Sequence, residues 1–555
     1  MVEKERLFKF KNIIIFFVTS FFIIFPFFYL HLVRKFPTSI VRNVELNYIL
    51  FALLGLIVAL FSISSFAKIR DMHKKEIILL LLKIGLVFYA LFLLLVTYSR
   101  YVSFASEVVD LTYYHSTIWQ LSEFQVPHIW DIPQRFVWGD HFEPIILFIV
   151  PIYWLIKSAG LLMIIQAGIV ISGIIPLYLV VTDRLKSRLI GLAIAFSYIA
   201  FGGLQYGIEY GFHPIMFFPT LFFWMYYFYA KKKIKLYFLF ALLCLFIKEE
   251  VSLILLFWGL YIAIFKKERI MGIGTCLISL LWYLLCFQII FPHFSSGGFG
   301  HWGQYGSAEG TGLMGIIKLL LFKPYLFFNT LITPSYKIDT IFLSFGAFSF
   351  LLFLYPPSLM LVIPSLLEKL LSSNLAGVSG THYSAAITGV IVVATIESLL
   401  FLSKKDYIRR ITTSWNIFFG VLIFYVAFFA NTINGYHAYS IYDIGRQKTL
   451  PDENLLSLEK VIGQIPSNAS VSTQYQIIPH IYSLSSKVKS IPTENETSDY
   501  VIVDLLMPPV LTNVKAINKN LEALSKNDDY KLIINNSRVV VFKKKLIPID
   551  INSKL

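Results

Sequence analysis

Long apolar runs separated by short polar connections fill the sequence up to about residue 431. A helix needs about 20 apolar residues to cross the hydrocarbon core of a bilayer, with roughly 17 to 25 tolerated, so these runs predict membrane-spanning helices. We expect thirteen spans, at residues 12–30, 47–67, 77–98, 161–181, 188–206, 214–231, 235–248, 250–265, 270–291, 338–354, 357–371, 386–403 and 412–431. The seventh and eighth are short and meet at Lys248-Glu249-Glu250, so two helices and one broken helix are both open interpretations.

Basic residues mark every second connection between the expected spans. Three or four Lys or Arg residues occur in each of the N-terminal stretch and residues 68–75, 184–188, 231–235, 266–269 and 404–410. The connections at 207–213 and 373–385 carry none. By the positive-inside rule the basic connections are cytoplasmic and the others face outward.

Residues 145–156 are apolar but break this alternation if they are counted as a span. The segment has only a dozen residues and contains Pro151. We therefore interpret it as an in-plane or re-entrant helix at the outer surface.

The two ends of the chain differ from its middle. Lys4, Arg6, Lys9 and Lys11 precede the first apolar run, which has no small-residue cleavage site, so we expect an uncleaved signal anchor with a cytoplasmic N-terminus. Residues 450–548 alternate short β-rich runs, at 469–475, 500–505, 530–534 and 538–542, with helical stretches such as 513–525. This pattern predicts a small extracytoplasmic α/β domain.

The expected fold is an all-α polytopic membrane protein with a small C-terminal α/β domain. We divide it into residues 1–98 (anchor and first three spans), 99–160 (outer loop with in-plane helices), 161–431 (remaining spans) and 432–555 (extracytoplasmic domain).

Composition agrees with a multi-pass protein of the cell membrane. Hydrophobic residues make up 57% and charged residues 15% of the chain, whereas soluble domains carry about 25% charged residues. The formal net charge of +15 comes from basic residues placed between spans, so it does not indicate nucleic-acid binding. Cys244, Cys276 and Cys286 lie in apolar segments and predict neither disulfides nor a metal site.

The unusual polar residues fall at the outward-facing ends of spans or in outer loops, above all in residues 98–144. Asp110 begins a helix-like run with apolar neighbours and with His115 in the next turns. A partly desolvated carboxylate there is suited to accept a proton from an attacking hydroxyl. The alternative is a carboxylate that only caps a juxtamembrane helix.

Four further stretches carry candidate groups. Asp140, His141 and Glu143 have the oxygen and imidazole ligands of a divalent-metal site, such as Mg²⁺ or Mn²⁺, or form a hydrogen-bonded loop end. His213 is a candidate hydrogen-bond donor to a phosphate group, or it anchors its helix at the membrane interface. Lys248 is a phosphate ligand or the ion-pair partner of Glu249 or Glu250, and Glu250 is also a metal candidate. His382 and Tyr383 complete the set.

Nucleotide-binding and hydrolase motifs are absent from the sequence. It contains no P-loop, no dinucleotide-binding glycine fingerprint, no HExxH and no GxSxG. We expect no nucleotide cofactor.

Several stretches, in order, resemble a prokaryotic membrane family catalogued as domain of unknown function 2079. They are Val109-Asp110-Leu111 to Gln120, Asp140-His141-Phe142-Glu143-Pro144, Phe212-His213-Pro214, Lys248-Glu249-Glu250, Ile363-Pro364-Ser365-Leu366-Leu367, His382-Tyr383-Ser384 and Ile465-Pro466-Ser467-Asn468-Ala469-Ser470-Val471-Ser472. The resemblance covers residues 95–545. The sequence departs from the family at Glu143, where serine is frequent, and at Glu250, where aspartate is frequent.

That family is similar in layout to the GT-C glycosyltransferases, polytopic enzymes that take sugar from a polyprenyl-phosphate donor. The resemblance implies an inverting hexosyl or pentosyl transfer to a glycan, lipid or protein acceptor, with Asp110 as the acid of the first outer loop. Lys248 and His213 would hold the donor phosphate, supported by Asp140, His141, Glu143, Glu249 and Glu250. The alternative is a transporter or flippase for a lipid-linked or anionic solute, a class in which inverted repeats are common.

Overall fold

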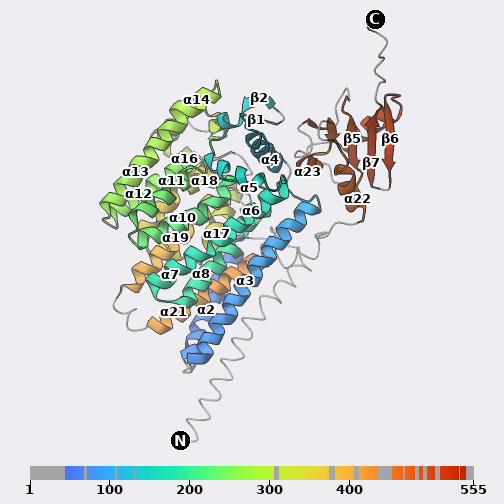
Figure 1. Ribbon diagram of the computed structural model, residues 1–555. Helices are drawn as coiled ribbons and strands as arrows, with labels where there is room; N and C mark the ends of the chain where they lie inside the picture. The colour runs from blue at the N-terminus through green and yellow to red at the C-terminus, as the bar shows by residue number, and fades with distance from the viewer. Residues whose placement is uncertain are drawn as a thin grey trace, which may run out of the picture.

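A computed structural model of the chain describes residues 44–67, 72–106, 109–130, 132–209, 211–305, 312–373, 382–405, 412–433, 453–466, 469–481, 487–491, 497–506, 513–536 and 538–545. The expected signal anchor and its basic flank lie outside these residues. Figure 1 shows a large helical bundle with a smaller, strand-containing C-terminal part beside one of its ends.

The bundle consists of helices of very different length. They are α2 (Val44–Ala67), α3 (Met72–Val102), α4 (Val109–Ser122), α5 (Val150–Tyr153), α6 (Ala159–Ser172), α7 (Ile174–Leu185), α8 (Arg188–Ala200), α9 (Gly202–Glu209), α10 (Phe218–Ala230), α11 (Ile234–Leu245), α12 (Val251–Ile264), α13 (Arg269–Leu284), α14 (Phe291–Phe294), α15 (Gly312–Phe322), α16 (Pro324–Ile332), α17 (Tyr336–Gly346), α18 (Leu359–Leu371), α19 (Ser384–Ser403) and α21 (Thr412–Ile433). Short 3-10 turns join several of them, and a π-helical turn, η4 (Leu285–Ile290), connects α13 to α14.

Most of the expected spans coincide with helices, but their lengths vary. Within the described residues, four helical stretches are long and apolar enough to cross a membrane, namely His73–Val102, Ala159–Leu185, Arg269–Phe294 and Ser384–Ser403. The number rises to six if two bent pairs are each one span. The chain is therefore mostly helical with several candidate spans, and the full count of thirteen stays a prediction.

The structure differs from the expected spans at three places. The run at 188–206 is divided between α8 and α9, which meet with a bend of 51°. The run at 338–354 is not one helix, because α17 ends at Gly346 and a separate 3-10 turn covers Leu351–Leu354. Residues 312–332, which we did not expect to be a span, form α15 and α16 with a bend of 110°. Lys318, Lys323 and Pro324 interrupt the apolar pattern there and hid it from a hydropathy argument. The boundary between the seventh and eighth expected spans is a tight turn between α11 and α12.

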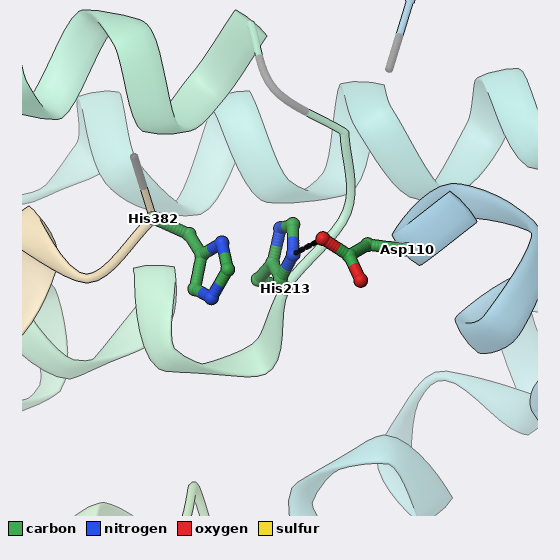
Figure 2. A group of neighbouring side chains, drawn as sticks. All are labelled: Asp110, His213 and His382. Carbon is green, nitrogen blue, oxygen red and sulfur yellow. Dashed lines mark ion pairs between the residues drawn. The ribbon is translucent and has the colours of Figure 1, made fainter. Parts of the chain in front are cut away.

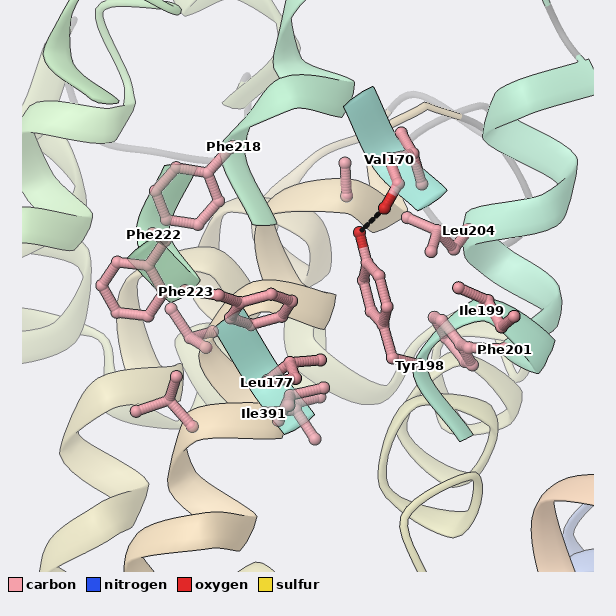
Figure 3. Packing of buried hydrophobic residues seen from close by; sticks show 14 of the residues in the cluster. Val170, Leu177, Tyr198, Ile199, Phe201, Leu204, Phe218, Phe222, Phe223 and Ile391 are labelled. Atoms are coloured by element: carbon pink, nitrogen blue, oxygen red, sulfur yellow. Dashed lines mark hydrogen bonds between the residues drawn. The ribbon is translucent and has the colours of Figure 1, made fainter. Parts of the chain in front are cut away.

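Helix α19 occupies the centre of the bundle, with nearly every residue from Ser384 to Leu400 buried. Aromatic and aliphatic side chains of α7, α8 and α10 pack around it, as Figure 3 shows for Leu177, Phe218 and Phe223. Gly389 allows a close approach, because a Cβ there would lie 3.0 Å from the Phe218 ring. The hydroxyl of Tyr198 donates to the Val170 carbonyl at 2.9 Å, which satisfies the phenol inside this apolar core.

Basic residues from separate connections meet at one end of the bundle. Arg184 Nη1 lies 2.8 Å from Glu397 Oε1, and Lys266 pairs with the same carboxylate. Lys231 Nζ lies 3.1 Å from Asp183 Oδ2. Three connections that the positive-inside rule assigned to one face therefore share one end of the fold.

The C-terminal part contains a five-stranded mixed sheet among its described residues. Its strands are β3 (Val471–Thr473), β4 (Val488–Ser490), β5 (Tyr500–Asp504), β6 (Tyr530–Asn535) and β7 (Val539–Lys544), in the order β4-β3-β5-β7-β6. β3 is parallel to β4 and β5, and β7 is antiparallel to β5 and β6. Helices α22 (Glu453–Ile462), α23 (Ile478–Ile481) and α24 (Val514–Ser525) accompany it. Each of the four predicted β-rich runs contains a strand, and β4 was missed.

The outer loop and the C-terminal part lie at the same end of the bundle. Figure 1 shows α4, α14 and the small hairpin of β1 (His128–Ile129) and β2 (Ile132–Phe136) at the end where the sheet is found. His480 of α23 stacks on Phe104 and Tyr101 with ring centroids 3.8 and 4.3 Å apart. The expected in-plane segment forms two short turns, Pro144–Phe148 and α5, with exposed Phe148, Trp154 and Leu155 side chains.

Candidate active site

Asp110 lies in the first turn of α4, with its carboxylate against His213 (Figure 2). His213 Nε2 is 3.1 Å from Asp110 Oδ2. The side chain of Asp110 is 37% exposed, whereas His213 is buried. The pair therefore combines a fixed imidazole with a carboxylate that solvent or a ligand can reach.

His213 is held from several sides. Its backbone N–H donates to Gln166 Oε1 of α6 at 2.6 Å, and Gln166 Nε2 donates to the Gly211 carbonyl at 2.6 Å. Its ring stacks on His382 with centroids 3.6 Å apart and an interplanar angle of 13°. Gln166 was not a sequence candidate, yet it fixes the loop that carries His213.

Opposing effects set the charges of this pair. Removal from bulk water raises the pKa of Asp110, but the hydrogen bond and charge of His213, with smaller contributions from Lys248 and His141, outweigh it and leave the pKa below its ordinary value. Burial lowers the pKa of His213, and Asp110 compensates only in part. At neutral pH the geometry thus favours an ionised Asp110 that accepts a hydrogen bond from neutral His213.

A second cluster lies on the neighbouring loops. His301 Nε2 is 3.0 Å from Asp140 Oδ1, and the rings of His301 and His141 stack at 4.4 Å and 7°. His141 Nδ1 lies 2.8 Å from Glu249 Oε1. Burial raises the pKa of Asp140, but the bond to His301 and the nearby His141 and Arg135 outweigh it and hold that pKa below its usual range.

Two glutamates connect this cluster to the helices. The Phe142 N–H donates to Glu249 Oε2 at 3.2 Å, so the Glu249 carboxylate holds both the loop backbone and His141. The Tyr114 hydroxyl of α4 donates to Glu143 Oε1 at 3.0 Å. Burial raises the pKa of Glu143 well above its ordinary value.

A cavity of about 460 Å³ opens beside the second cluster. Most of its wall is apolar and comes from α12, η4, α15 and α18, and includes Leu253, Leu256, Phe257, Phe287, Ile316, Ile317, Ile363 and Leu367. One region of the wall is polar, with His141, Lys248, Glu249, Glu250, His301 and Glu368. The volume falls in the range of roughly 300–1,000 Å³ that is usual for small-molecule sites.

Lys248 links the cavity to the Asp110 pair. Its ammonium lies 3.4 Å from Glu250 Oε2 and 5.7 Å from the centre of the Tyr383 ring. Tyr383 contacts His382 with ring centroids 4.0 Å apart, and His382 stacks on His213. A continuous row of side chains therefore leads from the cavity to Asp110, although Asp110 and His213 do not line the cavity itself.

Residues 132–541 match the family described as "Predicted membrane protein (DUF2079)". The chain belongs to this family. Two solved structures of ArnT from Cupriavidus metallidurans are similar to this DUF2079 protein at 10% sequence identity. The one bound to undecaprenyl phosphate has a TM-score of 0.42 and covers 82% of this chain and 98% of its own. The apo structure has a TM-score of 0.40 and covers 83% and 98%. A search of curated proteins found no match.

In this DUF2079 protein most sequence candidates lie close together, and His115 does not. Its Nε2 lies 2.8 Å from the Tyr153 hydroxyl in a fully buried setting, and burial lowers its pKa to about 3. His115 is thus a packing residue between α4 and α5, on a different side of α4 from the Asp110 pair.

Sequence reasoning assigned no role to His301, Gln304 or Glu368. Gln304 Nε2 contacts His301 Nδ1 at 3.0 Å, and Glu368 shares a hydrogen bond with Glu250. His301 stands at the end of a polar, glycine-rich stretch, and the structure shows that its partner is Asp140. Glu368 was visible as an acid near the end of an apolar run, a signal that we did not use.

Proposed function

We propose that this protein transfers a sugar from a polyprenyl-phosphate donor to an acceptor hydroxyl at the outer face of the cell membrane. The observation that carries the proposal is an apolar cavity with a polar region at Lys248, connected through Tyr383 and His382 to the Asp110–His213 pair. The wall matches a ligand that has a hydrocarbon chain and an anionic head.

The donor chain would lie along α12, α15 and α18. Leu256, Phe257 and Leu367 offer the hydrocarbon surface that a prenyl chain favours. Lys248 would hold a phosphate oxygen in a charge-assisted hydrogen bond, sharing its ammonium with Glu250. His213 would support this position indirectly, because its ring stacks on His382, which contacts Tyr383 beside Lys248.

The transfer itself requires one base and one stabilised leaving group. The acceptor oxygen attacks the anomeric carbon while Asp110 takes the hydroxyl proton, and the bond from that carbon to the phosphate oxygen breaks. The phosphate leaves with the bonding electrons, and Lys248 balances the added negative charge. Attack from the face opposite the leaving group inverts the anomeric centre.

His213 would act on Asp110 and not on the sugar. Its Nε2–H holds Oδ2, which leaves Oδ1 of the carboxylate for the acceptor hydroxyl. The C-terminal part, packed near α4 through His480, would help to position the acceptor.

The test is sugar transfer by the purified protein in liposomes that contain labelled polyprenyl-phosphate sugars. Asp110→Asn should lower the transfer rate about 10²–10⁴-fold, the usual contribution of a general base. Asp528→Asn, an exposed aspartate of the C-terminal part, is the matched control and should leave the rate unchanged. Movement of intact donor across the bilayer without transfer would instead support a flippase.

A further inference from the structure

Two histidines and one aspartate on neighbouring loops place their ligand atoms close together. Asp140, His141 and His301 each offer one ligand atom, and these atoms lie within 4.8 Å of one another. All three side chains are partly exposed, at 20%, 18% and 31%. The group is therefore open to an ion from solvent or from the cavity that His141 and His301 line.

We propose that Asp140, His141 and His301 bind a transition-metal ion such as Zn²⁺ or Mn²⁺. This site does not depend on the transfer reaction proposed above, because it rests on the ligand geometry alone. Two imidazoles and one carboxylate suit these ions better than Mg²⁺, which prefers an all-oxygen shell.

The partners of the two histidines support this assignment. His141 Nδ1 is held by the Glu249 carboxylate at 2.8 Å, and His301 Nδ1 by the Gln304 amide at 3.0 Å. Metal-ligating histidines are typically fixed in this way through the second ring nitrogen. Both Nε2 atoms remain as ligand atoms, and His301 Nε2 already points to Asp140 Oδ1 at 3.0 Å.

Side-chain rotations are needed to complete the site. A tetrahedral ion with bonds of about 2.0 Å holds its ligand atoms roughly 3.3 Å apart. The rings of His141 and His301 are stacked at 4.4 Å and 7°, so they must also turn out of this parallel arrangement before both nitrogens face one ion. Both side chains are partly exposed, which allows this rotation and closes the difference from 4.8 Å. In the metal-bound form the Gln304 side-chain amide would be flipped, so that its oxygen accepts a hydrogen bond from His301 Nδ1–H. His301 Nε2 then carries no proton and can bind the ion.

The other candidate group in the described residues, Asp110, His213 and His382, fits an ion less well. His213 and His382 are buried and stack at 3.6 Å, so their rings cannot turn without breaking the packing.

The experiment measures Zn²⁺ and Mn²⁺ binding to the full-length protein in detergent after removal of metal, by elemental analysis and equilibrium titration. The parent should bind one equivalent. His301→Ala and Asp140→Asn should lose that equivalent, and Glu249→Gln should weaken the affinity about 10–100-fold. His293→Ala, an exposed histidine of the neighbouring α14, is the matched control and should bind like the parent.

Size-exclusion profiles identify variants that fail to fold. One folded variant, either His301→Ala or Asp140→Asn, is enough for the test. Equal binding by the parent and by a folded His301→Ala variant would overturn the proposal. Loss of the ion in His382→Ala with retention in His301→Ala would also overturn it, by moving the metal to the Asp110 group. Because metal content is measured without donor or acceptor, failure of the proposed transferase activity leaves this result unaffected.

Discussion

The charge of Asp110 depends on its neighbours more than on its partial exposure. His213 approaches from the bundle, and Lys248 and His141 contribute positive charge from the turn before α12 and from the loop at residue 141. These groups hold the pKa of Asp110 below its ordinary value, while burial holds that of His213 below its own. The carboxylate is thus ionised and the imidazole neutral throughout the neutral range.

This arrangement predicts the acid side of the pH profile. A carboxylate with a depressed pKa becomes protonated only when the pH falls below its ordinary value of about 3.9, and His213 becomes protonated only below about 6.5. The transfer rate should therefore stay constant from about pH 6.5 to 8 and fall only in more acid solution. A rate measured over pH 4 to 9 checks this. A fall centred near pH 7.5 would contradict the assigned charges.

Asp110 was identifiable from sequence because an acid between apolar residues at the start of a helix is unusual. Its partner His213 was identifiable from sequence only as a candidate polar residue. Nothing in residues 207–213 indicates that its ring contacts α4. Gln166, which fixes that loop, lies within an expected span and carries no local signal. Sequence thus identified candidate residues where an ionisable side chain lies among apolar residues, because burying such a group is energetically costly. It did not identify which of these residues contact one another.

Helices α12, α15 and α18 form the apolar wall of the cavity. Replacing Leu256 of α12 with Trp should fill part of the 460 Å³ and exclude a long prenyl chain. The KM for a long-chain donor should rise about tenfold or more, corresponding to roughly 1.4 kcal/mol of lost binding, with little change for a donor of one or two prenyl units. Leu260→Trp, one turn further along α12 and outside the cavity lining, is the control. Equal KM values for both donors in both variants would contradict this use of the cavity.

Lys248, in the polar region of the cavity, should bind the phosphate of the donor. Lys248→Met should raise the KM for the phosphate donor by about one to two orders of magnitude, because a charge-assisted hydrogen bond contributes roughly 1.5–3 kcal/mol. Lys318→Met, an exposed lysine of α15, should not change it. A KM unchanged by Lys248→Met would remove Lys248 from donor binding.

Helices were predictable from hydropathy where an apolar run is long and uninterrupted, as in α3, α13 and α19. The pair α15 and α16 was missed because a 110° bend lets two short helices share a run that contains lysines and a proline. Local pattern therefore indicates which residues are apolar but not how the chain bends to bury them.

In the whole molecule, the buried carboxylate of Glu397 joins three helices at the end opposite the candidate site. Arg184 and Tyr226 lie 2.8 and 2.5 Å from its Oε1, and Tyr261 lies 3.2 Å from its Oε2. Lys266 completes the network. Basic residues that the positive-inside rule assigned to the cytoplasmic face thus also form ion pairs within the fold, a role that a topology rule does not reveal.

Glu397→Gln should destabilise the protein by about 3 kcal/mol, because two partly buried cations lose their counter-charge. Unfolding in mixed micelles measures this. Glu268→Gln, which breaks the more exposed pair with Lys232 at the same end, should cost less than about 1 kcal/mol. The donor KM should be the same in both variants. A larger loss for Glu268→Gln than for Glu397→Gln would contradict the assignment.

The central claim is that Asp110 performs chemistry on a donor that other residues bind. Its most direct test measures, on one preparation of Asp110→Asn in liposomes, both the Kd for the polyprenyl-phosphate sugar and the single-turnover rate of transfer. We predict a Kd within about twofold of the parent and a rate lowered about 10²–10⁴-fold. A transfer rate equal to that of the parent, or a rate loss explained entirely by a weaker Kd, would contradict the account.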